Sequence, residues 1–281
     1  MAIKIITDST SDIQRSEAKK LGAEIVPLNV IFEGSSFKEG IDITNDSFYS
    51  KLKEAKELPT TSQPSPQDFL EYFLEAKRSG DTVIAILLSS KISGTVQSAN
   101  IAKEIADYSS IYIIDSLSSI MGLRLLVEYA LELRDEGKTP EEIVEIIEEA
   151  KNRVAIYAVV DTLEYFLKGG RLSKGNAMVG TLLNLKPIVG LKEGSLQMVG
   201  KARGLNNAIN SLFKEIEKEG DFDLSRPVYF GYTETEDKCL LLMEKAKERF
   251  NLKNTPMYPV GCVIGTHAGP GASAIAFLRK K

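Results

Sequence analysis

The sequence predicts an α/β protein whose first half is built around a parallel sheet and whose second half is a mixed, partly antiparallel α+β unit. Three observations support this prediction: strand-like runs in the first half, helical patterns that alternate with them, and a hairpin signal in the second half. The runs are short and nearly continuous in apolar residues, which is typical of strands covered on both faces. They occupy residues 3–7, 25–31, 82–88 and 111–115.

Helical patterns lie between or after these runs, at residues 12–21, 66–79, 94–106 and 119–136. The pattern at 66–79 is the clearest, because Ser65 suits its N-cap, Pro66 suits its first position and its apolar residues share one face. Alternation of strands and helices predicts a doubly wound sheet. Residues 33–60 interrupt the alternation with a Gly-Ser-Ser turn and a short helix near 46–57, and we expect them to cover the edge of the sheet.

The second half follows a different pattern, after a helix at 140–153 that closes the first half. Its strand candidates are residues 155–160, 187–191, 197–201, 228–232 and 257–260. The run Lys-Glu-Gly-Ser at 192–195 is a hairpin turn and predicts antiparallel pairing of its neighbours. Helices at 206–218 and 236–250 then cover one face of the sheet. We therefore expect an amino-terminal α/β domain over residues 1–153 and a carboxyl-terminal α+β domain over residues 154–281.

Composition excludes several classes of protein. The 281 residues are 43% hydrophobic and 26% charged, as in folded globular proteins. The formal net charge is -4 and the charges alternate in sign along the chain, so no basic surface for a nucleic acid is expected. No apolar run approaches the roughly 20 residues of a transmembrane helix, and the first residues lack a signal-peptide pattern. Two distant cysteines, read as free buried thiols, fit a cytoplasmic protein.

Two polar segments precede predicted helices and suit an anion-binding site. The run TTSQPS at 60–65 holds more hydroxyl and amide groups than a helix cap at Ser65 requires, which leaves Thr61, Ser62 and Gln63 available for a function. The run SSKISGT at 89–95 follows a predicted strand, and ligands of open α/β sheets bind at that end of the strands. Beside Ser93, a helix amino terminus offers N–H groups to an anion and Gly94 permits close approach to the backbone. An ordinary cap and an ordinary strand-to-helix turn are the structural alternatives.

The only histidine of the chain, His267, lies in the run GTHAGPG at 265–271. A single histidine is more often structural than functional, but the Gly-Pro-Gly turn next to it favours a functional role. This turn predicts a terminal helix that places His267 at a helix amino terminus. With one histidine and no cysteine or carboxylate at a matching spacing, we predict no metal site.

Two arginines and two aspartates leave functional and structural interpretations open. Arg171 lies in the run Gly-Gly-Arg-Leu-Ser and Arg203 precedes Gly204; each can recognise a carboxylate or pair with a surface acid. Asp8 and Asp12 follow the first predicted strand, where they could bind a metal together with a phosphate. We interpret Asp12 as a structural residue of the N-cap type. The role of Asp8 stays open.

Together these segments resemble the DegV family, and the resemblance covers essentially the whole chain. It rests on motifs that follow one another in the family's order: TDST at 7–10, TSQPS at 61–65, SSKISGT at 89–95, DS at 115–116, GGRLS at 169–173, KP at 186–187 and THAGPG at 266–271. Ile92 and Val96 stand where the family often has Leu and Tyr, a departure that concerns the fit of an acyl tail. The resemblance implies an α/β domain followed by an α+β domain.

The resemblance also implies a carrier and not an enzyme. A long-chain fatty acid would lie in an apolar tunnel, with its carboxylate held by Thr61, Ser93 and His267 next to Gly94, and no cofactor would be needed. The implied partner is the catalytic protein of a fatty acid kinase, which phosphorylates the bound carboxylate for phospholipid synthesis. A transient contact with a membrane surface is compatible with this role.

Three further residues take secondary roles in this interpretation. Ser62, Arg171 and Arg203 are expected to support the ligand site or to contact the partner, with Arg203 on the surface that docks the kinase. The first alternative is an acyl hydrolase that uses Ser93, His267 and Asp8, although no GxSxG elbow surrounds the serine. The second alternative is a phosphotransferase, because the family fold resembles dihydroxyacetone-kinase domains; the chain has no Walker loop.

Overall fold

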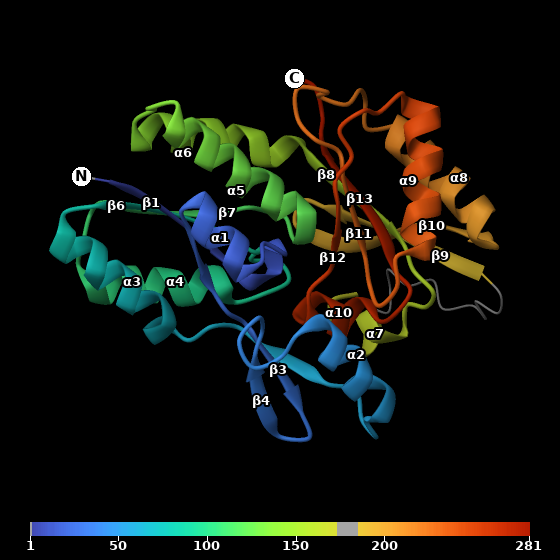
Figure 1. The fold of residues 1–281 in the computed structure, drawn as a ribbon, viewed down its shortest axis with the longest axis horizontal. Helices are drawn as coiled ribbons and strands as arrows, with labels where there is room; N and C mark the ends of the chain where they lie inside the picture. Colours follow the sequence, from blue (N-terminus) through green and yellow to red (C-terminus); the bar gives the residue numbers. More distant parts are fainter. Residues whose placement is uncertain (1, 173–184) are drawn as a thin grey trace.

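The computed structural model describes residues 2–172 and 185–281. Its first sheet is parallel and has four strands in the order β2–β1–β6–β7. The strands are β1 (Ile3–Asp8), β2 (Ala23–Val26), β6 (Thr82–Leu87) and β7 (Ile111–Asp115). All six residues of β6 are buried, as the continuous apolar run predicted. The α/β class of the first half is therefore confirmed (Figure 1).

Helices cover both faces of the parallel sheet, because successive side chains of a strand point to opposite faces. On β1, Ile6 packs with α3 (Pro66–Ser79) and α4 (Thr95–Ala106), whereas Ile5 packs with the helices of the opposite face. Those helices are α1 (Arg15–Leu21), α5 (Ile120–Asp135) and α6 (Pro140–Ala150). The arrangement is the predicted doubly wound one.

The second sheet is mixed and has six strands in the order β10–β9–β8–β13–β11–β12. Only β11 and β12 pair in parallel. The strands are β8 (Val154–Val159), β9 (Leu185–Lys192), β10 (Ser195–Arg203), β11 (Tyr229–Tyr232), β12 (Met257–Pro259) and β13 (Ser273–Leu278). At the predicted hairpin, Glu193 and Gly194 have φ values of 49° and 79°, the pair of positive angles that a type I′ turn requires. The mixed class of the second half is confirmed.

Helix α5 joins the two sheets into one packed unit. One face of the mixed sheet is covered by α8 (Leu205–Glu217) and α9 (Asp237–Phe250), and its other face packs against α5. The same helix covers the parallel sheet (Figure 1). Ile5 and Ile156 consequently belong to one buried cluster. This cluster crosses the predicted boundary between residues 153 and 154, and the boundary itself stays a prediction.

The predicted strand at 25–31 is in fact two strands in different sheets. Pro27 follows the end of β2, and because it has no N–H to donate to a ladder, the chain leaves the parallel sheet there. After it, β3 (Asn29–Phe32), β4 (Ser35–Lys38) and β5 (Thr60–Ser62) form a third, antiparallel sheet in the order β4–β3–β5. With α2 (Asn45–Glu54), residues 33–60 extend this sheet instead of covering the edge of the parallel one.

The predicted helix after Gly-Pro-Gly is also wrong. Instead, α10 (Cys262–Ala268) ends before this turn, and residues 273–278 form β13 in the middle of the mixed sheet. Gly269 and Gly271 have φ values of 70° and 76°, which redirect the chain into the strand. His267 consequently lies in the last turn of a helix and not at a helix amino terminus.

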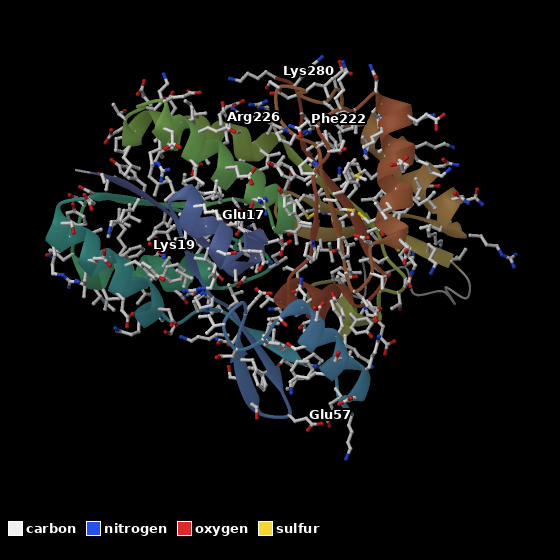
Figure 2. All side chains as sticks on the ribbon, in the orientation of Figure 1. Glu17, Lys19, Glu57, Phe222, Arg226 and Lys280 are labelled. Carbon is white, nitrogen blue, oxygen red and sulfur yellow. The ribbon has the colours of Figure 1, made fainter. Side chains whose placement is uncertain are left out.

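Charged side chains such as Lys19, Glu57 and Lys280 are exposed on the outer surface (Figure 2). Cys239 and Cys262 are buried free thiols, as predicted. Within residues 2–172 and 185–281, every helix is too short or too polar to cross a membrane. The short helix α7 (Glu164–Lys168) packs against α10 and completes the wall of a cavity between the sheets.

Candidate functional site

A cavity of about 330 Å³ lies where the end of β6, the start of α5 and the inner face of the mixed sheet meet. This volume is within the range of about 300–1,000 Å³ that is typical of small-molecule sites. Most of the lining side chains are aliphatic, and they come from β8, β9, β11, β13 and α10. The cavity therefore suits a ligand that is largely apolar.

A row of small residues forms the floor of this cavity. Gly231, Ala274, Ala158 and Val189 are direct cross-strand partners on β11, β13, β8 and β9, and all four line the cavity. Direct partners project from the same face of a sheet, so their small side chains leave a trough across it. Ala158 stays partly exposed although its strand lies inside the sheet, because it borders this open space.

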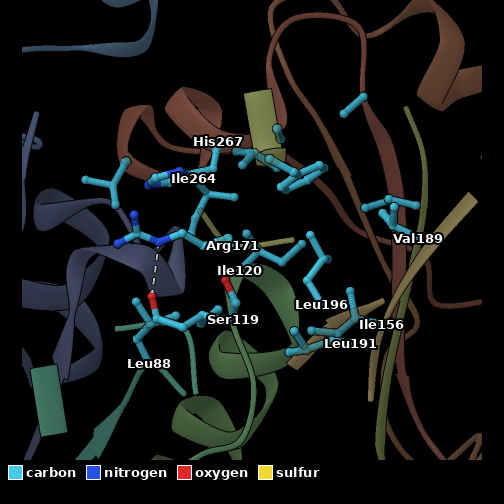
Figure 3. Close-up of a pocket in the computed structure, with 18 of the residues that line it drawn as sticks. Leu88, Ser119, Ile120, Ile156, Arg171, Val189, Leu191, Leu196, Ile264 and His267 are labelled. Carbon is cyan, nitrogen blue, oxygen red and sulfur yellow. Dashed lines mark hydrogen bonds between the residues drawn. The ribbon is translucent and has the colours of Figure 1, made fainter. Parts of the chain in front are cut away.

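Three residues named from the sequence line the cavity, and two of them meet at its polar end. Thr61 Oγ1, on β5, lies 2.8 Å from His267 Nε2, on α10. Ser93 lines the same cavity; its Oγ lies 2.8 Å from Thr95 Oγ1 and accepts the Thr95 N–H at 3.3 Å. Figure 3 shows His267 and Arg171 toward one end of the cavity and Val189 and Leu191 toward the other.

His267 is electrically neutral at pH 7. Burial lowers the pKa of its imidazole to about 4, and the positive charge of Arg171 adds to this effect. Its Nδ1 has no hydrogen-bond partner in the described part of the chain. In the tautomer protonated at Nε2, the ring donates to Thr61 Oγ1, and the Thr61 hydroxyl can then donate its own proton to an acceptor in the cavity.

Arg171 and Ser62 also line the cavity. Arg171 Nη1 donates to the carbonyl of Gly169 at 2.7 Å and Nε donates to the carbonyl of Ile92 at 3.3 Å, which orients the guanidinium. Burial lowers the pKa of Arg171, but a guanidinium keeps its charge in proteins. Ser62 Oγ accepts the side-chain N–H of Asn29 at 3.2 Å.

Gly94 and Arg203 lie outside the lining of the cavity. Gly94 is the N-cap of α4, and a Cβ there would be 2.2 Å from the Gln63 side chain. The group that approaches the Gly94 backbone closely is therefore the side chain of Gln63. Gln63 itself lines the cavity. Arg203 is exposed at the end of β10, which leaves it accessible to a partner.

The two aspartates of the first motif have structural partners. Asp8 accepts the N–H groups of Leu88 at 2.7 Å and Thr10 at 3.0 Å, and it thereby anchors the segment that leads to Ser93. Asp12 is structural, as interpreted, but it is not the N-cap of α1, which is Gln14. Its φ of 57° directs the carboxylate to the N–H of Gly261, at 2.9 Å.

The bonds of a hydrolase triad are not formed by these groups. A nucleophile must bond to the base, and a carboxylate must orient the base. Ser93 Oγ instead bonds to Thr95, Asp8 bonds to Leu88 and Thr10, and His267 bonds to Thr61. Among the described residues, no three His, Cys, Asp or Glu side chains are grouped as a metal site would require.

The residues that form the apolar part of the cavity were not predicted from the sequence. Gly231, Ala158 and Ala274 carry no chemical signal, because small residues are ordinary inside sheets. Ser119 was assigned to a helix start, yet its hydroxyl makes no capping bond and it lines the cavity (Figure 3). A serine at a predicted helix start is too common to indicate a ligand.

The fold and the cavity together define a class: an α/β protein with a parallel and a mixed sheet and an apolar cavity that ends in hydroxyl and imidazole groups. The family model of DegV, described as a family of uncharacterised proteins, matches residues 2–280. A DegV domain-containing protein of Caldanaerobacter subterraneus is 38% identical over 278 residues, which are 99% of each chain. The chain therefore belongs to the DegV family, as its motifs predicted.

Solved structures of the family have the same fold. A DegV family protein from Thermus thermophilus, described by its fatty acid binding, is 33% identical with a TM-score of 0.90, over 99% of this chain and 100% of its own. The fatty acid kinase (Fak) B3 protein of Streptococcus pneumoniae, loaded with linoleic acid, is 26% identical with a TM-score of 0.87, over 100% of both chains.

Proposed function

We propose that this protein binds a long-chain fatty acid in the cavity and presents its carboxylate to the catalytic protein of a fatty acid kinase. The carboxylate would be held by Thr61, Ser93 and His267, and the acyl tail would lie over the floor of small residues. The observation that carries the proposal is the cavity itself, which is aliphatic along its length and polar where Thr61 and His267 meet. The fatty acid ligands of the structural relatives support it.

Hydroxyl donors suit a carboxylate that must be handed on. A carboxylate binds strongly to a bidentate arginine, and such a pair is costly to break once it is buried. Hydrogen bonds from Thr61 and Ser93 are weaker, and the neutral ring of His267 orients one of them without adding a positive charge. The nearby guanidinium of Arg171 supplies a favourable field. The protein then acts as a carrier, and the phosphoryl transfer takes place on the partner.

The partner would approach the polar end of the cavity and contact the surface that includes Arg203. The exposed side chain of Arg203 supports its assignment to the docking surface. No cofactor is part of the proposal.

Native mass spectrometry of the purified protein, followed by extraction of the bound lipid, tests the fatty acid. We expect an adduct with the mass of a long-chain fatty acid in the wild type. The adduct should be reduced in Thr61→Val and Ser93→Ala. Thr60→Val is the matched control, because Thr60 is the exposed neighbour of Thr61 on β5 and should leave the adduct unchanged.

A delipidated wild type that does not rebind palmitate would contradict the binding proposal. To test the partner, the loaded protein is mixed with a fatty acid kinase catalytic protein and ATP, and acyl phosphate is measured. Arg203→Glu should lower acyl phosphate formation while it leaves the adduct intact. Equal loss of the adduct would instead show that Arg203 acts on binding.

A further inference from the structure

The helix that carries His267 is held at its start by two carboxylates from distant parts of the chain. The N–H of Gly261 donates to Asp12 Oδ1 at 2.9 Å, and the N–H of Val263 donates to Glu39 Oε1 at 2.9 Å. The first N–H groups of a helix have no partner within the helix, and Gly261 has no side chain that could cap them. Asp12 and Glu39 therefore do the capping from outside.

Both carboxylates are fixed in place and buried, with 5% and 7% exposure. Arg124, which is 1% exposed, donates from Nη1 to the carbonyl of Asp12 at 3.3 Å. Its guanidinium also lies 3.6 Å from the ring centre of Tyr258, two residues before Val260 and at the entry to α10. Arg124 thus contacts both Asp12 and the segment that leads into α10, and these two contacts set the position of Asp12 relative to the start of the helix.

Because helix α10 is short, the position of its first residues also determines the position of His267 at its other end. Its seven residues span about 10 Å, so its first N–H groups and its last turn move as one body. Val263, Ile264 and His267 all line the cavity. A displacement of the helix start would change the distance between His267 and Thr61, which approach from separate elements.

The two carboxylates also lie next to each other. A Cβ placed on Gly261 would be 2.4 Å from Glu39 Oε1 and 3.1 Å from Asp12 Oδ1, so both groups crowd the same backbone position. Their second oxygens, Asp12 Oδ2 and Glu39 Oε2, are buried and have no hydrogen-bond partner among the described residues. A buried oxygen without a partner favours the protonated acid, and two adjacent carboxylates favour a shared proton.

Burial is the largest influence on the pKa of both carboxylates, and the charges around them are of both signs. Burial raises the pKa of Glu39 to about 7, with the Ser9 hydroxyl and the Val263 and Cys262 N–H groups opposing the rise and Asp8 adding to it. Burial likewise raises the pKa of Asp12 well above its usual value, with Glu39 and Asp8 adding to the rise and Arg124 opposing it. The Cys262 thiol and the Tyr49 hydroxyl also face the pair, and both stay neutral because burial raises the pKa of each. Two charged side chains, Arg15 and Asp46, line the same pocket as the two carboxylates.

We propose that Asp12 and Glu39 are positioning residues for the carboxylate site: they hold the start of α10, set the place of His267 against Thr61, and make this placement depend on the ionisation of the pair. The proposal rests on the proposed function for its consequence in fatty acid binding. Its structural part, the link between the pair and the His267 ring, can be measured without a ligand.

The chain has a single histidine, so the NMR signals of a ¹³C- and ¹⁵N-labelled imidazole report on His267 alone. In the delipidated wild type we expect the ring signals to shift with an inflection near pH 7, where Glu39 ionises, well above the imidazole's own titration near pH 4. Glu39→Gln keeps an oxygen for the Val263 N–H and removes the charge. The inflection near pH 7 should vanish in this variant, and its affinity for palmitate should lose the change with pH that the wild type shows over the same range.

Glu39→Ala and Asp12→Ala remove the acceptor and should move the ring signals at every pH and weaken palmitate binding about 10-fold, the effect of about one lost hydrogen bond. The control is Glu57→Ala, at an exposed carboxylate beyond the end of α2 (Figure 2). If an alanine variant does not fold, Glu39→Gln alone decides the matter.

An inflection near pH 7 that persists in Glu39→Gln, or ring signals in Glu39→Ala identical to those of the wild type, would overturn the inference. A wild type that shows the expected ring response but binds no palmitate would overturn the proposed function and leave the positioning role standing. The two failures are therefore distinguishable.

Discussion

Filling the floor of the cavity should shorten the acyl chain that the protein accepts. Ala158 is the position of choice, because it lies on β8 in the middle of the floor and is partly exposed to the open space. Ala158→Leu adds three carbons to that space. An acyl tail would lose about the same number of buried methylene groups, each worth about 0.8 kcal/mol. The expected loss is about 2.4 kcal/mol, or roughly a 60-fold weaker affinity for palmitate.

The assay is titration calorimetry of the delipidated protein with fatty acids of decreasing length. A ligand about three carbons shorter than palmitate avoids the new side chain, so the variant and the wild type should bind it with similar affinity. The melting temperature of the empty variant should not fall, because the leucine enters space that is open in the unliganded protein and displaces no core side chain. An affinity for palmitate within about threefold of the wild type, or an equal loss at every chain length, would refute the reasoning.

Two further predictions concern stability. The pKa of His267 is about 4 in the folded protein and about 6.5 when unfolded, so its contribution to the free energy of unfolding is fully present above pH 6.5 and falls by about 3 kcal/mol as the pH drops to 4. Urea unfolding at pH 7 and 4.5 should therefore show a smaller loss of stability at the lower pH in His267→Gln than in the wild type. An equal loss in the two proteins would contradict the prediction. Gly194→Ala should cost at least about 1–2 kcal/mol in urea unfolding, because Gly194 has a φ of 79° and a Cβ there would also lie 2.5 Å from Ser89 Oγ. Gly200→Ala, in the same hairpin but without a positive φ or a contact that short, is its control, and equal losses in the two would contradict the prediction.

Local signals were sufficient for much of the fold. The strand at 82–87 is apolar at nearly every position, so its burial follows from composition alone. Ser65 and Pro66 mark the start of α3, and Glu193-Gly194 marks the hairpin, because capping and positive φ angles are properties of a few consecutive residues. These elements need no knowledge of their neighbours.

The errors have a common physical cause. Residues 273–278 are a short apolar run that suits a helix or a strand, and β13 exists because β8 and β11 offer ladders on both sides. The placement of residues 33–60 in a third sheet likewise depends on the partners β3 and β5. Strand pairing between distant segments is decided by packing, which a sequence window does not contain.

Motifs and periodicity in the sequence were sufficient to predict the family, the two fold classes and several polar residues that line the cavity. The hydrogen bond between Thr61 and His267, which are 206 residues apart, and the neutral state of the imidazole arise only from tertiary contacts and burial. It also decided where the apolar floor lies, because Gly231, Ala274 and Ala158 become neighbours only through strand register. The chemical type of a side chain determines which bonds it can make, whereas burial and strand register determine which of these bonds form.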